Sequence, residues 1–143
     1  MGLESILSAT DISASGLAAE RLRMEVIANN IANAHSTRGA NGGPFRRQEV
    51  VFRAAFDQAG LAGENFRGVQ VVAVQPDQSE LPRVYRPGHP DADADGFITM
   101  PNVRIPNEMV DLITASRGYE ANLRMLRSFR EMANNTLDIL RGA

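Results

Sequence analysis

The sequence predicts an α+β fold, in which long N-terminal and C-terminal helices form a coiled-coil-like pair around a small β-rich insert. Two observations support this prediction. Apolar residues recur at spacings of three and four over residues 3–34 and 108–140, whereas all prolines and most glycines lie between these segments. A helix with an apolar stripe must bury that stripe, and the middle segment is too small to cover both. We therefore expect the terminal helices to pack on each other, on other molecules, or on both.

The chain divides into an N-terminal helical segment (1–34), a loop with a β-rich insert (35–106) and a C-terminal helical segment (107–143). Its 143 residues are an ordinary size for one domain, and a hydrophobic content of 43% argues against wholesale disorder. The net charge is −2, all basic residues are arginine, and no long basic run is present. Nucleic-acid binding is therefore not expected.

Three absences narrow the functional class further. The chain has no cysteine, which excludes disulfides, thiolate catalysis and zinc sites built on cysteine. It has no run of about 18 apolar residues, so we expect no membrane insertion. Glu4 and Asp11 stand where a signal peptide would need a basic and an apolar region, so no cleaved signal peptide is expected. The sequence also gives no reason to expect a cofactor.

The first helix is predicted from about Glu4 to about Asn33. Gly16 lies inside it and weakens it by about 1 kcal/mol relative to alanine. Seven of nine positions at alternating spacings of four and three are apolar, which is a heptad-like seam. These positions are Leu3, Leu7, Thr10, Ala14, Leu17, Arg21, Met24, Ala28 and Ile31.

The middle segment begins with a glycine-rich loop over residues 35–44 and continues with short runs that resemble strands. The expected strands are residues 48–52, 68–74, 83–85 and 97–100. Residues 54–60 are expected to form a helical turn or a loop. Arg46 and Arg47 are adjacent, and one of them could reach a partner carboxylate. Since two strands alone are marginally stable, the insert should lean on the helices or on a neighbouring subunit.

The last helix is predicted from about Asn107, a candidate N-cap, to about Leu140, with Gly142 ending it. At 1.5 Å per residue it would be about 50 Å long. Eight of ten positions at spacings of three and four are apolar. These positions are Met109, Leu112, Ser116, Tyr119, Leu123, Leu126, Arg130, Ala133, Leu137 and Leu140.

An asparagine cluster marks the end of the first helix. Asn29 and Asn33 are four residues apart and share a helix face, and Asn30 lies between them. Amides on a seam can fix the register of packed helices at some cost in stability. Asparagines also cap helix ends. The residues by themselves leave these two interpretations open.

Asp91, Asp93 and Asp95, followed by Gly96, match the opening of a calcium loop. The match fails at the twelfth position, where Asn102 replaces the bidentate glutamate. A calcium-binding interaction module is therefore the alternative function, and a solvated turn is the simpler interpretation. His89 with Asp91 suggests a third function, a small hydrolase, but no nucleophile or metal-ligand spacing supports it.

Longer motifs resemble a known family. Residues 27–33 (IANNIAN), followed by a Ser-Thr and an arginine, resemble the N-terminal signature of bacterial flagellar rod and hook proteins. Residues 109–113 (MVDLI) and 116–122 (SRGYEAN) resemble their C-terminal signature. Residues 42–48 (GGPFRRQ), 87–93 (PGHPDAD) and 101–103 (PNV) resemble the FlgC family of proximal-rod proteins. Gly118 departs from the family, which usually has alanine before the tyrosine.

This resemblance implies a non-enzymatic structural subunit of the flagellar basal-body rod, a drive shaft that transmits torque through the periplasm. It implies export by the flagellar type III apparatus without a cleaved signal peptide, and terminal segments that become helical on assembly. The expected partners are copies of the chain and other rod proteins, with basal-body ring and export-gate components as further candidates. The residues expected at subunit contacts are Leu17, Met24, Asn29, Asn30, Ile31, Asn33, Leu112, Tyr119, Glu120, Asn122, Leu123 and Leu126.

Overall fold

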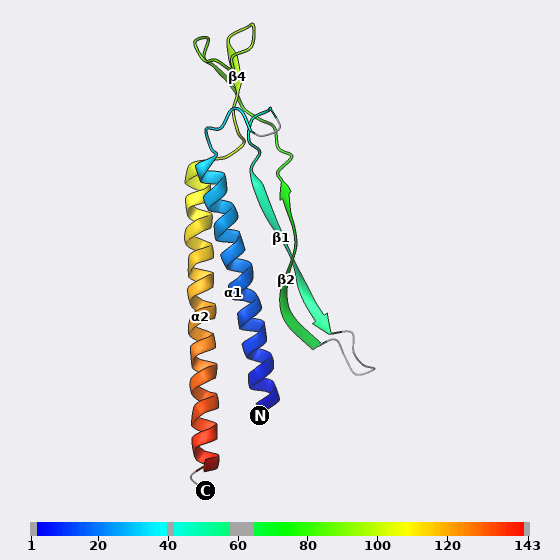
Figure 1. Cartoon of the computed structure of the whole chain (residues 1–143), viewed down its shortest axis with the longest axis vertical. Coiled ribbons are helices and arrows are strands. Elements are labelled where there is room, and N and C mark those ends of the chain that lie inside the picture. The colour runs from blue at the N-terminus through cyan, green and yellow to red at the C-terminus, as the bar shows by residue number, and fades with distance from the viewer. Residues whose placement is uncertain (1–2, 40–41, 58–64, 142–143) are drawn as a thin grey trace.

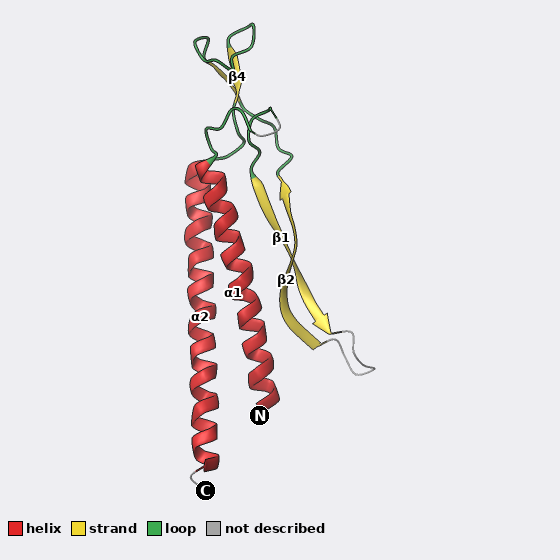
Figure 2. Ribbon diagram, viewed as in Figure 1, coloured by secondary structure: helices red, strands yellow, loops and turns green. Residues whose placement is uncertain are grey.

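The computed structural model describes residues 3–39, 42–57 and 65–141 of the chain. Two long helices, α1 (Leu3–Ala32) and α2 (Ile105–Arg141), lie side by side, with a β-hairpin beside α1 and a second, short hairpin beyond the helix ends (Figures 1 and 2). The long hairpin consists of β1 (Gln48–Asp57) and β2 (Asn65–Pro76). The short one pairs β3 (Arg83–Tyr85) with β4 (Phe97–Thr99). The predicted α+β fold is confirmed.

The two helices run antiparallel in a single register. Gly16 faces Asn122, Glu20 lies over Gly118, and the side chain of Asn30 contacts that of Glu108. Equal steps forward along α1 therefore match equal steps backward along α2. Both chain ends consequently lie at the same end of the molecule, as Figure 1 shows.

The face that α1 buries differs from the stripe we predicted. Ala19, Val26 and Ile27 are buried, whereas Ala14 and Arg21 of the predicted stripe are exposed. Small apolar residues surround much of this helix, so the periodicity alone did not decide which face packs.

The predicted N-cap of α2 is also wrong, because the helix begins before Asn107. The amides of Asn107 and Glu108 both donate to the carbonyl of Arg104, at 3.0 and 3.1 Å. Gly142 lies outside the described residues.

The β1–β2 hairpin is longer than predicted. Its pairing runs from Gln48 opposite Pro76 to Asp57 opposite Asn65, with two irregularities in register. Residues 54–57 belong to β1, which corrects the expected helical turn or loop, while residues 58–60 lie outside the described part of the chain. The pairing of β3 with β4 agrees with the two weaker strand predictions.

Hydrogen bonds fix the hairpin to α1 at two positions along the helix. The amide of Val69 donates to Ser15 Oγ (3.0 Å), and Gln48 bonds to Asn30. From Ser15 to Asn30, α1 rises about 22 Å. Gln48 pairs with Pro76, and the seven residues from Val69 to Pro76 cover about 23 Å of strand. Because the two lengths match, the hairpin can lie along the helix without bending away. Within the described residues, α1 contacts both α2 and the hairpin, whereas the backbones of α2 and the hairpin do not come together.

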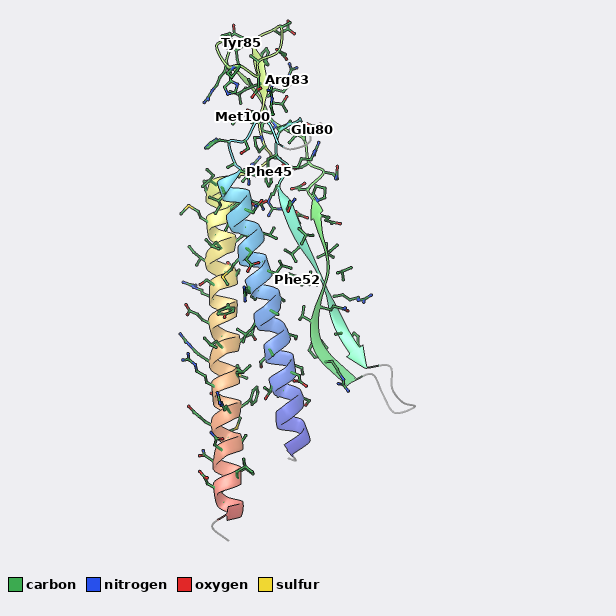
Figure 3. All side chains as sticks on the ribbon, in the orientation of Figure 1. Phe45, Phe52, Glu80, Arg83, Tyr85 and Met100 are labelled. Carbon is green, nitrogen blue, oxygen red and sulfur yellow. The ribbon has the colours of Figure 1, made fainter. Side chains whose placement is uncertain are left out.

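The short hairpin forms the tip of the molecule and is held together by side-chain contacts. Figure 3 shows Arg83 and Tyr85 at the end of the molecule farthest from the chain termini. Arg83 pairs with Asp93 and lies over the ring of Phe97, 5.0 Å from its centroid. Tyr85 packs edge-on against Phe97. Gly96 has φ 79°, which lets the turn before β4 close tightly.

Within the residues that the structure describes, neither α1 nor α2 contains an apolar stretch that could span a membrane.

Candidate functional site

A buried polar junction joins the helices to the hairpin. Asn30, with no exposed surface, accepts from the amide of Gln48 (2.9 Å) and donates to its carbonyl (2.9 Å) and to Glu108 Oε2 (3.0 Å). Its side-chain amide thus pairs with the first residue of β1 as another strand would. One side chain thereby ties α1 to both β1 and α2.

Glu108 and Arg47 form the charged part of this junction. Glu108 is 1% exposed, and Arg47 Nε donates to its Oε1 at 2.5 Å. Burial acts to lower the pKa of Arg47, but its bond to Glu108 and the nearby Glu49 carboxylate hold that pKa above its ordinary value. A buried carboxylate is tolerable only when paired and hydrogen-bonded, and both conditions hold here.

The backbone of Arg47 fixes the surrounding loops. Its amide donates to Asn102 Oδ1 (2.8 Å), and its carbonyl accepts from the amide of Asp77 (2.7 Å). Asn102 in turn donates to Ser79 Oγ (2.8 Å). Bonds from the backbone and side chain of Ser79 lower the pKa of Asp77. The segments before β1, after β2 and before α2 therefore meet at one point.

This junction changes the role predicted for Asn30 and shows which carboxylate Arg47 contacts. We expected Asn30 at a subunit contact, but its hydrogen-bonding groups are used inside the chain. We suggested that one of Arg46 and Arg47 reaches a partner carboxylate, and Arg47 does so within the same chain. Glu108 was missed because its partners are distant in sequence. A carboxylate in the first turn of α2 was the only local signal.

Another asparagine of the cluster, Asn33, caps the end of α1. Asn33 Nδ2 donates to the carbonyl of Asn29 (3.0 Å), and Ser36 Oγ donates to Asn33 Oδ1 (3.1 Å). Asn29 itself is exposed. Within one chain, the capping interpretation therefore describes Asn33, whereas the exposed Asn29 stays a predicted subunit-contact residue.

On α1, the predicted apolar contact residues flank the helix pair. Gly16 faces α2, and Leu17, Met24 and Ile31 lie about 60° to 100° to one side of that contact, since an α-helix turns about 100° per residue. All three are half-buried. They form a stripe beside the α1–α2 contact.

On α2, the matching residues lie on the same side. On this helix, Asn122 faces Gly16. A rotation of about 40° to 100° from Asn122, in the same sense as on α1, leads to Leu112, Tyr119, Leu123 and Leu126. In an antiparallel pair of right-handed helices, equal rotations of the same sense lead to the same side. All four are half-buried. The two stripes make one continuous surface, here called the lateral face: Leu17, Met24, Ile31, Leu112, Tyr119, Leu123 and Leu126.

Two polar candidates lie elsewhere on α2. Glu120 is exposed and lies 3.6 Å from Arg124 in a surface ion pair. Such pairs contribute about 0–1 kcal/mol. Asn122 packs against Gly16, where a Cβ on the glycine would come within 2.8 Å of its amide nitrogen. Asn122 is therefore part of the contact between α1 and α2.

The aspartates of the calcium-like turn do not converge. Asp91 binds Thr37 (2.8 Å) and Arg38 (2.7 Å). Asp93 binds Arg83 and accepts from the amides of Asp95 and Phe97. Among the described residues, no three His, Cys, Asp or Glu side chains could hold a metal ion together. The turn is held by its own hydrogen bonds, and the calcium alternative has no support.

The chain exposes far more surface than a compact protein of its mass. Its accessible area is 10245 Å² for 15.6 kDa, against about 7,200 Å² expected for a globular monomer of that mass. Large apolar side chains contribute, including Val110 (63% exposed), Ile113 (54%) and Ile139 (73%). Such a surface is typical of a chain that has partners.

Comparison with known proteins gives the family. Residues 11–40 match the family described as flagella basal body rod protein, and residues 94–139 match the one described as flagellar basal body rod FlgEFG protein C-terminal. The chain is 42% identical to the flagellar basal-body rod protein FlgC of Salmonella typhimurium, over 94% of this chain and 98% of that protein. It is 38% identical to FlgC of Borreliella burgdorferi, over 96% and 99%. The chain belongs to the FlgC family.

Membership of the FlgC family makes the chain a structural subunit of the flagellar basal-body rod and not an enzyme. The two matched segments cover most of α1 and most of α2. The identity to FlgC of Agrobacterium fabrum, 34% over 99% of both chains, extends across the hairpins as well.

Proposed function

We propose that this FlgC-family subunit joins the rod through its lateral face, which receives helices or strands of neighbouring subunits. The observation that carries the proposal is the half-buried state of all seven residues of that face. Completing the burial of a leucine or tyrosine side chain is worth about 1 kcal/mol or more. Assembly supplies the surface that the single chain lacks.

The antiparallel α1–α2 pair is the stiff element of this proposal. A coiled-coil-like pairing over the length of α1, about 45 Å, resists bending and twisting better than single helices do. The helices α1 and α2 form this pair, and the described residues between them form the insert. Such a pair suits a proximal rod segment that transmits torque.

The remaining parts of the proposal concern location and partners. The subunit lies in the periplasmic part of the basal body and leaves the cytoplasm through the flagellar type III apparatus, without a cleaved signal peptide. Its neighbours are copies of itself and other rod proteins. Basal-body ring and export-gate components are further partners near the ends of the rod. The family membership supports these assignments.

A pair of substitutions on α2 tests the lateral face. Leu123→Asp places a charge on the face, whereas Ser128→Asp places it on an exposed position about 140° around the helix. In a bacterium that lacks its own copy of the gene, electron microscopy of purified basal bodies should show complete rods with Ser128→Asp and none with Leu123→Asp. Complete rods with both variants would refute the proposal.

A further inference from the structure

The side of α2 that faces away from α1 is apolar near the start of the helix. Met109, Val110 and Ile113 are 54%, 63% and 54% exposed. They lie about 120° to 180° around α2 from Asn122, which faces α1. We call these three residues the outer face of α2. A helix with an apolar stripe normally buries it, so the outer face of α2 should have a cover.

The side of α1 that faces away from α2 carries mostly small residues. Glu25, Ala28, Asn29 and Ala32 are all exposed and lie about 120° to 180° around α1 from Gly16. We call these four residues the outer face of α1. Their spacings of three and four make them the four corners of one hole, the kind of site that receives a side chain from a facing helix.

We propose that the outer face of α2 of one copy packs on the outer face of α1 of a second copy, with Ile113 in this hole. The inference rests on the proposed function, in which the chain assembles into the rod, and it adds a second contact to the lateral face. If the two copies have the same orientation, the helices in contact are antiparallel, as α1 and α2 are within one chain. Inside the chain, too, a bulky side chain lies over a small residue, as Glu20 does over Gly118.

Exposed charges favour a second copy as the partner. With Ile113 in the hole, Arg117 of one copy lies level with Glu25 of the next, and Glu120 lies level with Arg21. These four charged side chains are exposed. The charges run in opposite order along the two antiparallel helices, so opposite signs face each other at both levels. Such complementarity selects a partner and fixes its register.

The same register determines the kind of assembly. Within one chain, Ile113 lies level with Glu25, as the contacts of Asn30 with Glu108 and of Glu20 with Gly118 show. The centre of the hole lies three to four residues further along α1, which shifts the neighbouring copy by about 5 Å along the helix axis. A contact between two different surfaces is heterologous, and the axial shift prevents it from closing as a flat ring. The copies therefore continue as a helix.

Disulfide formation tests this contact without background, because the chain has no cysteine. The double variant Ala28→Cys/Ile113→Cys carries one thiol on each outer face. Within one chain these positions lie on opposite sides of the helix pair, and a disulfide requires Cα atoms within about 7 Å. Only two different copies can therefore form it. In the matched control Ala18→Cys replaces Ala28→Cys, since Ala18 is exposed on the same side of α1, about 15 Å along the helix.

Basal bodies purified from cells that express each variant are oxidised and separated under denaturing, non-reducing conditions. The double variant should give a ladder of oligomers of this chain that a reducing agent abolishes, and each single-cysteine variant at most a dimer. The Ala18→Cys/Ile113→Cys control should give no ladder. Rods that contain the double variant but show no ladder would overturn the contact and leave the lateral face intact. Complete rods with Leu123→Asp would instead overturn the proposed function, whatever the ladder shows.

Charge reversal tests the same contact if the cysteines prevent assembly. Glu25→Arg places two cations opposite each other, because it faces Arg117 of the next copy, and should lower the yield of complete rods. Adding Arg117→Glu should restore most of that yield. A single variant with the wild-type yield, or a double variant without recovery, would overturn the contact.

Discussion

The carboxylate of Glu20 on α1 lies over Gly118 on α2. A Cβ added to Gly118 would come within 3.2 Å of Glu20 Oε1 and 3.3 Å of its Cδ. Among the described residues, Glu20 Oε2 is buried without a hydrogen-bond partner, and its nearest cation is Arg23, at 3.9 Å. The missing Cβ of Gly118 thus accommodates a bulky charged side chain on the facing helix.

This relationship predicts a coupling between the two positions. Gly118→Ala alone should weaken the helix pair or leave it unchanged, because the new methyl group displaces Glu20. In a Glu20→Ala background, the same change should stabilise by about 1 kcal/mol, the usual gain from replacing glycine inside a helix. The measurement is the urea concentration that releases the protein from purified basal bodies. Equal effects of Gly118→Ala in both backgrounds would show that Glu20 does not require the glycine.

The buried junction should be the most sensitive polar site of the chain. Glu108→Gln should cost about 1–3 kcal/mol, because both buried Glu108 oxygens accept hydrogen bonds and the amide nitrogen of glutamine would instead face a donor, Asn30 or Arg47. Asp111→Asn is the control, because Asp111 is 39% exposed and lies 3.6 Å from Arg47. Its effect should stay below about 1 kcal/mol. The same urea release assay compares the two, and similar effects would mean that the junction adds little.

The hairpin depends on a glycine against α1. Gly68 has φ +113°, and a Cβ there would lie 2.1 Å from Ser15 Oγ and 3.1 Å from Ser15 Cβ. Gly68→Ala should therefore cost about 1–3 kcal/mol through backbone strain and the lost contact. Gly88→Ala meets nothing within 4 Å and is the control. Protease sensitivity of the hairpin should rise only in the first variant, and unchanged cleavage would refute this role for Gly68.

The tip should lose order in acid. The amide of Phe97, and also Arg83 and the amide of Asp95, hold the pKa of Asp93 below its ordinary value of 3.8. A carboxylate whose pKa is lower in the folded state stabilises that state above the unfolded pKa, and this contribution is lost as the pH falls through the folded value. NMR of the chain should show β3–β4 contacts weakening below about pH 4. Asp93→Asn should remove this dependence and Asp95→Asn should not.

The strongest periodic patterns predicted the elements well. Apolar residues at spacings of three and four predicted the ends of both helices to within a few residues. More than thirty residues of consistent spacing outweigh a single glycine such as Gly16. Runs rich in β-branched residues predicted β1 and β2, and two weaker runs, 83–85 and 97–100, predicted β3 and β4. Residues 54–57 were misread because Ala54 and Ala55 have little strand preference. Their place in the sheet comes from pairing with Val69 and Gly68.

Sequence spacing by itself determined that two apolar helices bracket a β-rich insert and, through the resemblance of its motifs, that the chain is a rod protein. Only the tertiary structure decided which helix faces meet, that Asn30 is used inside the chain, and that Arg47 reaches Glu108. The physical reason is that periodicity reports how much apolar surface a helix carries. Which part of it is buried depends on groups brought together from distant positions, such as Gly16 with Asn122 and Ser15 with Val69.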